Sequence, residues 1–86
     1  MRVMMVPIAV VARFPEKDLP RPVKFRLEQN GEVQEIKIDR IVTREEERLA
    51  GNRMLIFGCQ STIRGVERRY ELKYEVATCR WYLSKA

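Results

Sequence analysis

Residues 68–83 read RRYELKYEVATCRWYL and decide the fold, because apolar and charged residues alternate along them almost without error. Alternation with a period of two residues is typical of a β-strand that buries one of its faces. The pattern breaks at Ala77-Thr78 and then resumes, which indicates two strands joined by a turn. Ala-Thr is poor chemistry for a two-residue type I′ turn, so we expect a longer loop that keeps the same register.

Two other turns lie upstream and set the pairing of further strands. Asn30-Gly31 is a strong signal for a hairpin, because a type I′ turn needs positive φ at both central residues. Arg64-Gly65 predicts another hairpin. A slip of one residue would move every side chain to the other face, so each turn can be checked against the apolar pattern. The inward pairs that result are Phe25 with Ile36, Val23 with Ile38, Cys59 with Tyr70, Phe57 with Leu72, Leu55 with Tyr74, Tyr74 with Trp81, and Leu72 with Leu83.

One segment, IVTREEERLAGN at residues 41–52, has a helical signature. Thr43 with Glu46 three residues later fits a capping box. The run of glutamates suits the positive end of a helix dipole, and Gly51 fits a C-terminal stop. We therefore expect a short helix of one or two turns between Thr43 and Gly51. Adjacent glutamates point in different directions on a helix, so they do not converge on a metal ion.

The order of these elements predicts an all-β fold with one short helix in a single domain, residues 1–86. A first strand at Ile8–Phe14 precedes a stiff, proline-containing connector, and the hairpins follow. Six strands around one apolar face favour a small SH3-like or partly open barrel of antiparallel hairpins. A flatter sheet with the helix packed on it is the alternative. Asp39-Arg40 interrupts the alternation, so we expect a bulge there that turns a long strand round a corner.

Three short motifs resemble a loose group of small uncharacterised bacterial β proteins. They are a proline-led strand, Pro22-Val23-Lys24-Phe25, a second strand, Ile38-Asp39-Arg40-Ile41, and an aromatic C-terminal hairpin from Tyr70 to Leu83. The motifs are spread over most of the chain. The resemblance implies a fold and brings no activity with it.

Seventeen basic and twelve acidic residues give the chain a net charge of +5. The charges are interspersed rather than gathered in a run, so they favour an anionic partner only mildly. Residues 3–12 are apolar, but the very short basic region before them and Pro7 within them argue against a signal peptide. The stretch is also shorter than the roughly 20 residues that span a bilayer. We therefore expect a cytoplasmic protein with no membrane partner.

The two cysteines, Cys59 and Cys79, both fall on the inward face in the expected register. At about 3.3 Å per residue they lie roughly 20 Å apart along the strands. A disulfide needs Cα atoms within about 7 Å, so we expect two free, buried thiols, which suits a reducing compartment. Because the chain has no histidine, two cysteines do not complete a tetrahedral zinc site.

The residue types are poorly suited to catalysis. Histidine, the usual general base, is missing, and no serine or cysteine lies in a nucleophile turn. The stretch Gly58–Gly65 matches no phosphate-cradling loop. We expect no enzyme activity, no cofactor and no metal.

The outward face of the C-terminal hairpins is a candidate contact surface. Ile56, Lys73 and Tyr82 fall in one row across three strands, and Arg69 and Arg80 lie to either side. An aromatic and an apolar residue among cations is an arrangement with which small β domains bind single-stranded bases, so RNA or single-stranded DNA is the first candidate partner. The alternatives are that these side chains pack beneath other elements, or that they form a solvated face with cross-strand ion pairs.

A protein partner is the second hypothesis for this basic module. An exposed edge strand, Ile8–Phe14 or Cys79–Lys85, could accept a strand from another protein. Self-pairing of such an edge would give a homodimer.

Overall fold

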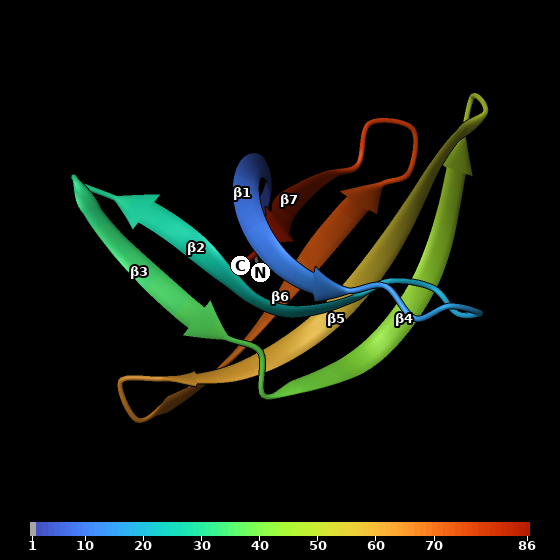
Figure 1. Cartoon of the computed structure of the whole chain (residues 1–86). Coiled ribbons are helices and arrows are strands. Elements are labelled where there is room, and N and C mark those ends of the chain that lie inside the picture. Colours follow the sequence, from blue (N-terminus) through green and yellow to red (C-terminus); the bar gives the residue numbers. More distant parts are fainter. Residues whose placement is uncertain (1) are drawn as a thin grey trace.

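The computed structural model describes residues 2–86, apart from the side chain of Gln29. Within these residues the chain forms seven β-strands and no helix (Figure 1). The strands are β1 (Val3–Arg13), β2 (Arg21–Gln29), β3 (Glu32–Lys37), β4 (Arg40–Leu49), β5 (Asn52–Ile63), β6 (Val66–Glu75) and β7 (Arg80–Lys85). The all-β class that the alternation predicts is confirmed, with seven strands in place of six.

All seven strands belong to one antiparallel sheet, in the order β3-β2-β1-β7-β6-β5-β4. The edge strands β3 and β4 follow one another directly along the chain. Among the described residues β3 pairs with β2 alone and β4 with β5 alone, so the sheet is not closed into a barrel. The predicted antiparallel hairpins are confirmed, and the predicted SH3-like barrel is not.

Two corners fold this sheet over itself. Strand β1 pairs with β7 up to Ile8 and with β2 from Ala9 onward. At the junction of β3 and β4, the backbone N–H of Asp39 donates to the carbonyl of Gln60 at 3.0 Å. The two ends of the sheet therefore approach each other at this junction, which gives the sheet the strong curvature seen in Figure 1.

The corner at Ile38-Asp39 lies where the sequence predicts it, but the bulge comes later in the chain. The pairing of β4 with β5 shifts register between Ile41 and Thr43. Gly58 lies opposite Thr43, and a Cβ atom on Gly58 would overlap the Oγ1 of Thr43. Glycine at this position of β5 therefore lets β4 approach closely at its bulge.

The core lies on the inner side of the curved sheet. The hairpins β2–β3, β5–β6 and β6–β7 have the predicted registers, with Phe57 opposite Leu72 and Tyr74 opposite Trp81. The ring centroids of Tyr74 and Trp81 are 4.7 Å apart. The buried cluster consists of Phe25, Ile36, Ile38, Leu55, Phe57, Cys59, Tyr70, Leu72, Tyr74, Trp81 and Leu83.

A buried polar contact holds β5 close to β3, a strand with which it does not pair. The hydroxyl of Ser61 lies 2.6 Å from the hydroxyl of Tyr70 and 2.7 Å from the carbonyl oxygen of Lys37. Burial raises the pKa of Tyr70 well above its ordinary value, so the phenol stays neutral. The core therefore contains a satisfied hydrogen-bond chain from β6 through β5 to the end of β3.

The predicted helix between Thr43 and Gly51 is wrong. These residues form most of β4 and its turn into β5, where Ala50 and Gly51 have positive φ angles of 50° and 81°. Two successive residues with positive φ fit a two-residue hairpin turn. Pairing with β5 satisfies the backbone groups of β4 that face β5, whereas an isolated helix of one or two turns would be marginal.

The prediction for the cysteines is half right. Both thiols are free, and Cys59 is buried as predicted, but Cys79 is exposed. Residues 76–79 form the longer loop that the sequence predicts between β6 and β7. Cys79 is the last residue of this loop and has a positive φ of 58°, which takes it out of the alternation that continues at Trp81.

The predicted edge strands are also wrong. In the strand order β7 lies between β1 and β6, and β1 lies between β2 and β7, with Ile8 opposite Trp81. Among the described residues, each half of β1 pairs on one side alone, residues 3–8 with β7 and residues 9–13 with β2. The pairing continues beyond the strands, because the N–H of Arg2 donates to the carbonyl of Ala86 at 2.8 Å. The edge strands of the sheet are β3 and β4, and each pairs with one neighbour through a local turn. These turns carry no information about where the first and last strands lie in the sheet.

Candidate nucleic-acid interface

The predicted row of Ile56, Lys73 and Tyr82 is confirmed as a spatial row. Ile56 lies opposite Lys73 across β5 and β6, and Lys73 lies opposite Tyr82 across β6 and β7. The chain neighbours of these residues belong to the core cluster, so the row is on the outer face of the sheet. Arg69 on β6 and Arg80 on β7 flank the row in opposite directions.

The three side chains of this row differ in how accessible they are to a partner. Ile56 is 9% exposed, so it packs within the outer face rather than projecting from it. The ammonium of Lys73 lies 3.6 Å from Oε2 of Glu47 on β4. Tyr82 is partly exposed and is the one aromatic residue of the row. Tyr82 is therefore the member that is best placed to contact a base.

The flanking arginines have acidic neighbours. Nε of Arg69 is 3.9 Å from Oε1 of Glu67. Arg80 lies opposite Glu75, and the hydrogen bond from Thr78 lowers the pKa of Glu75, so this carboxylate is charged near neutral pH. Ion pairs at an exposed surface are weak, so phosphate groups can compete with these carboxylates for the cations.

The outer face of β1 carries apolar side chains that the sequence interpretation did not consider. We call them the β1 stripe, which consists of every second residue from Val3 to Val11, namely Val3, Met5, Pro7, Ala9 and Val11. Val3, Met5 and Val11 are 76%, 50% and 54% exposed, although β1 is a central strand. Pro7 lies opposite Tyr82, so the stripe extends the row by one more strand. Residues 3–12 are apolar on both faces of the strand, so the sequence shows no alternation that separates this stripe from the core-facing residues, and the pairing of β1 with β7 was not predicted.

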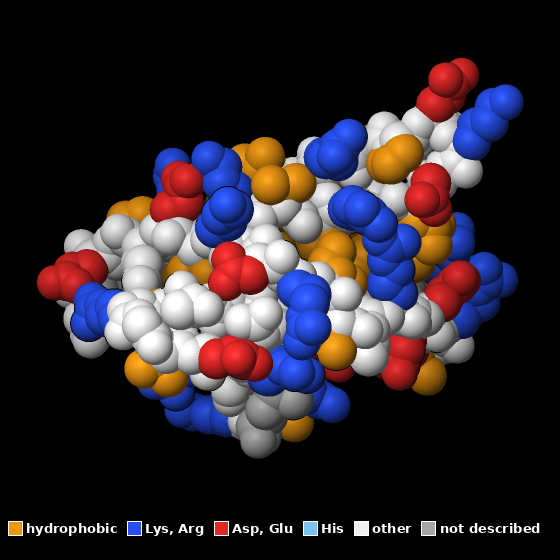
Figure 2. All heavy atoms as spheres, turned by 90° about the horizontal axis from the view of Figure 1, so that it is seen from below, with side chains coloured by type: hydrophobic (Ala, Val, Ile, Leu, Met, Phe, Trp, Pro, Cys, Tyr) orange, Lys and Arg blue, Asp and Glu red, His pale blue; other side chains and the backbone are white. Residues whose placement is uncertain are grey.

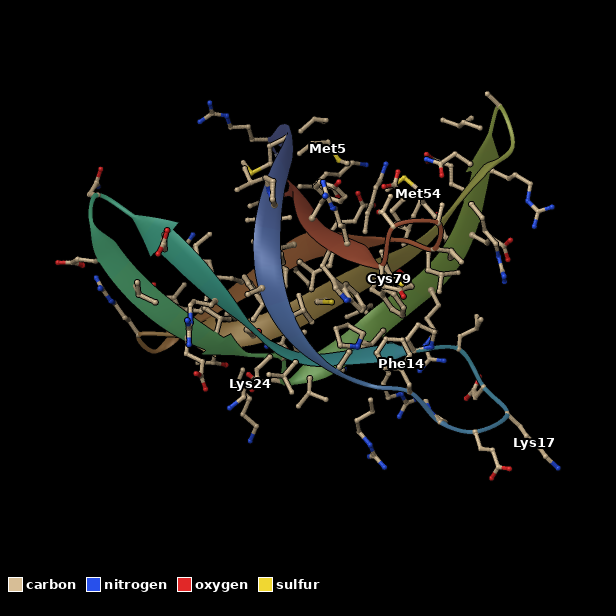
Figure 3. All side chains as sticks on the ribbon, turned by 45° about the horizontal axis from the view of Figure 1, so that its top comes forward. Met5, Phe14, Lys17, Lys24, Met54 and Cys79 are labelled. Atoms are coloured by element: carbon tan, nitrogen blue, oxygen red, sulfur yellow. The ribbon has the colours of Figure 1, made fainter. Side chains whose placement is uncertain are left out.

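Cations border the β1 stripe on β2. Arg26 lies opposite Ala9, and Lys24 lies opposite Val11. Lys24 projects away from the sheet (Figure 3), and its ammonium is 2.9 Å from Oε1 of Glu35. Arg26 has no ion-pair partner among the residues that the structure describes. Together with the cations on β6 and β7, these residues place positive charge on both sides of the stripe.

Neither a metal-ligand group nor a reactive Cys59 thiolate is present among the described residues. Within residues 2–86 no three His, Cys, Asp or Glu side chains are grouped so that they could hold a metal ion. Burial raises the pKa of Cys59 to about 12, so it is a neutral thiol at physiological pH. The exposed Cys79 lies in the loop between β6 and β7 (Figure 3). What the described surface offers a partner is therefore apolar area and positive charge.

Comparison with known proteins yields no relative of this chain, since no family model, curated protein or solved structure matches it. In the described part of the chain, no helix is long and apolar enough to cross a membrane.

Proposed function

We propose that the protein is a small basic binding module for single-stranded nucleic acid, either RNA or single-stranded DNA, and that it binds through the β1 stripe and Tyr82. The observation that carries the proposal is an exposed apolar stripe on a central strand, continued by an aromatic residue and bordered by cations. A contiguous apolar patch on a small protein commonly marks an interaction site. The cations on either side favour a polyanion as the partner.

Single strands suit this surface better than duplexes, because their bases can be splayed out against a protein. One base would stack on Tyr82 beside Pro7, and such a contact with an aromatic side chain contributes about 1–3 kcal/mol. The phosphates would lie toward Arg26 on β2 and toward Lys73 and Arg80 on the other side. Arg69 extends this basic border, and Ile56 forms part of its apolar floor.

Two further features belong to this proposal. The first is that the curved sheet acts as a partly open, SH3-like barrel, held at its seam by the bonds that join Asp39 to Gln60 and Ser61 to Lys37. The second is a cytoplasmic location, where single-stranded RNA is abundant and where free thiols stay reduced.

Fluorescence anisotropy with a short labelled oligouridine tests the proposal. We expect binding at low salt that weakens steeply as the salt concentration rises. Tyr82→Ala should weaken binding about tenfold through loss of the stacked ring, and Tyr82→Phe should retain it. Leu49→Ala is the control, because it removes an apolar side chain that is 65% exposed at the far end of β4. Absence of binding at low salt, or equal effects of Tyr82→Ala and Leu49→Ala, would contradict the proposal.

A protein partner is a second candidate, favoured by the unpaired edges of β3 and β4. A free strand edge can accept a strand from another chain. The run of charges on β4, residues 44–48, opposes pairing of this strand with a copy of itself, so β3 is the edge more open to a partner. Light scattering tests the self-pairing form of this candidate, since self-pairing through β3 gives twice the monomer mass and a strictly monomeric mass contradicts it.

A further inference from the structure

A second basic surface lies beyond the end of the β1 stripe, at the seam where the sheet does not close. It is a groove of about 560 Å³ between the start of β2 and the first half of β4. Four arginines line it, Arg13 and Arg21 from one side and Arg40 and Arg44 from the other. We call it the arginine groove. Figure 2 views the molecule from the side on which the corner between β3 and β4 lies, and shows Lys and Arg side chains gathered around hydrophobic ones.

The backbone topology forms this groove. Its lining includes Ile38, which belongs to the buried core, and Ile41, which packs against that core. After the corner at Ile38-Asp39 and the bulge between Ile41 and Thr43, the first half of β4 lies across the groove from the start of β2, and the two strands do not pair. The groove therefore has an apolar floor fixed by the core and a charged rim supplied by two separate parts of the sheet.

The arginines of the rim are placed where they repel one another. Arg13 lies directly opposite Arg21 in the pairing of β1 with β2. Like charges directly opposite each other on paired strands destabilise a sheet. None of the four arginines forms an ion pair with any side chain in the described part of the protein. No carboxylate at ion-pair distance therefore offsets their positive charge, in contrast to that of Lys73 and Arg69 on the outer face.

One carboxylate lies in the lining of the groove, and it is engaged elsewhere. Oδ2 of Asp39 accepts a hydrogen bond from the backbone N–H of Thr62 at 2.8 Å. This bond ties the corner between β3 and β4 to the end of β5. Asp39 therefore has a structural role at the seam, and the rim keeps an excess of three positive charges from four arginines and one aspartate.

We propose that the arginine groove binds a phosphate group. The planar guanidinium group matches phosphate oxygens with paired hydrogen bonds, and arginine is preferred over lysine where this geometry matters. The phosphate has two sources, the phosphodiester backbone of a nucleic acid or a small phosphate compound. In the first case the inference rests on the proposed function and adds a fixed backbone contact to the base contacts at the β1 stripe. In the second case it stands without that function.

This proposal makes a prediction about stability as well as affinity. Ligand that binds the folded state alone raises the unfolding temperature by mass action. Phosphate should therefore raise the unfolding temperature more than chloride at the same ionic strength. Replacement of one arginine of the opposed pair, Arg21→Gln, should raise the unfolding temperature in phosphate-free, low-salt buffer, because it removes the repulsion from Arg13.

The test combines thermal unfolding and calorimetric titration of the full chain with two probes, inorganic phosphate and a short oligouridine. Arg21→Gln and Arg44→Gln should each weaken binding of the groove's ligand about tenfold through loss of a charge-assisted contact. Arg68→Gln is the matched control, because Arg68 is also exposed and without an ion pair in the described residues but lies outside the groove. The Arg68→Gln substitution removes one positive charge, as the groove substitutions do, and should change the affinity for either probe less than about twofold.

The outcomes separate the two proposals. Binding of oligouridine that is weakened by the groove variants and retained by Arg68→Gln supports the groove with a phosphodiester as the source. Binding of phosphate without binding of oligouridine supports the groove with a small phosphate compound as the source, and overturns the proposed function. Binding of oligouridine that the groove and control variants weaken equally, with no effect of phosphate on unfolding, overturns the groove and leaves the proposed function standing.

Discussion

Strand β5 takes part in two hairpins that obtain their structure in different ways. With β6 it forms inner-face pairs such as Phe57 with Leu72, both at most 1% exposed. With β4 it pairs with a strand that has charges on both faces and no buried residue. The side chains of β6 specify the first hairpin, whereas the second depends on its turn, on its bulge and on the partner strand. Stability should therefore come mainly from the first hairpin, and the second should tolerate change except at the turn and the bulge.

The largest effect should come from truncating a side chain at the centre of the β5–β6 hairpin. Leu72 is 0% exposed, and Leu72→Ala should lower the free energy of unfolding by about 2–5 kcal/mol through lost burial and a cavity. Leu49→Ala at the exposed end of β4 should change it by less than about 0.5 kcal/mol. Urea-induced unfolding measures both, and effects of equal size would show that the two hairpins do not differ as described.

The bulge gives the next largest effect, and it is specific to β4. Gly58→Ala should lower the free energy of unfolding by about 1–3 kcal/mol, because its Cβ would overlap Oγ1 of Thr43. In the same chain, Thr43→Ala should recover most of this loss, since the other Thr43 atoms are at ordinary contact distance. A double-mutant cycle measures the coupling. If the effects of the two substitutions on the free energy of unfolding were simply additive, Thr43 would not be in contact with Gly58.

The turn between β4 and β5 provides a smaller effect of opposite sign. Ala50 has a positive φ of 50°, which asparagine adopts more readily than alanine. Ala50→Asn creates an Asn-Gly turn and should raise the free energy of unfolding by about 0.5 kcal/mol. In a helix the same substitution would lower it, because alanine is the better helix former. Thermal unfolding of the variant therefore distinguishes the hairpin from the helix that the capping box suggests.

The smallest effect should come from the ion pair on the β4–β5 hairpin, where Nε of Arg53 lies 2.7 Å from Oε1 of Glu46. The hydrogen bond from Arg53 lowers the pKa of Glu46. A lowered carboxyl pKa in the folded state stabilises the protein above the unfolded pKa and ceases to do so as the pH falls through the folded value. Glu46→Gln should therefore cause a slight loss of stability at pH 7 that disappears in acid, measured by urea unfolding at both pH values. Glu45→Gln is the control. An equal loss of stability in that variant would show that the ion pair of Glu46 with Arg53 makes no specific contribution.

The elements that the sequence predicts correctly are those set by local turns. The registers of β2–β3, β5–β6 and β6–β7 follow from short loops and strict alternation, and with them the row of Lys73 and Tyr82. The pairing of β1 with β7 joins the two ends of the chain, and no local pattern encodes it. The β1 stripe depends on that pairing, and the arginine groove combines residues from the end of β1, the start of β2 and the first half of β4, which lie far apart in the sequence. Neither surface could therefore be predicted from the local turns.

The β4 segment fails for a different reason. Its glutamates and Thr43 satisfy local rules for the start of a helix, and nothing in an edge strand with charges on both faces produces a clear alternation. The segment forms a hairpin rather than a helix because it pairs with the long strand β5, whereas a short isolated helix would be only marginally stable.

The most direct test of the nucleic-acid surface is an NMR titration of the ¹⁵N-labelled protein with a short oligouridine at low salt. The largest chemical-shift changes should occur at Met5, Val11 and Tyr82, with further changes at the arginine groove if a phosphodiester occupies it. The turns at Gly51 and Gly65, which lie outside both surfaces, should change little. No shift changes at all, or changes concentrated at those two turns, would contradict the account.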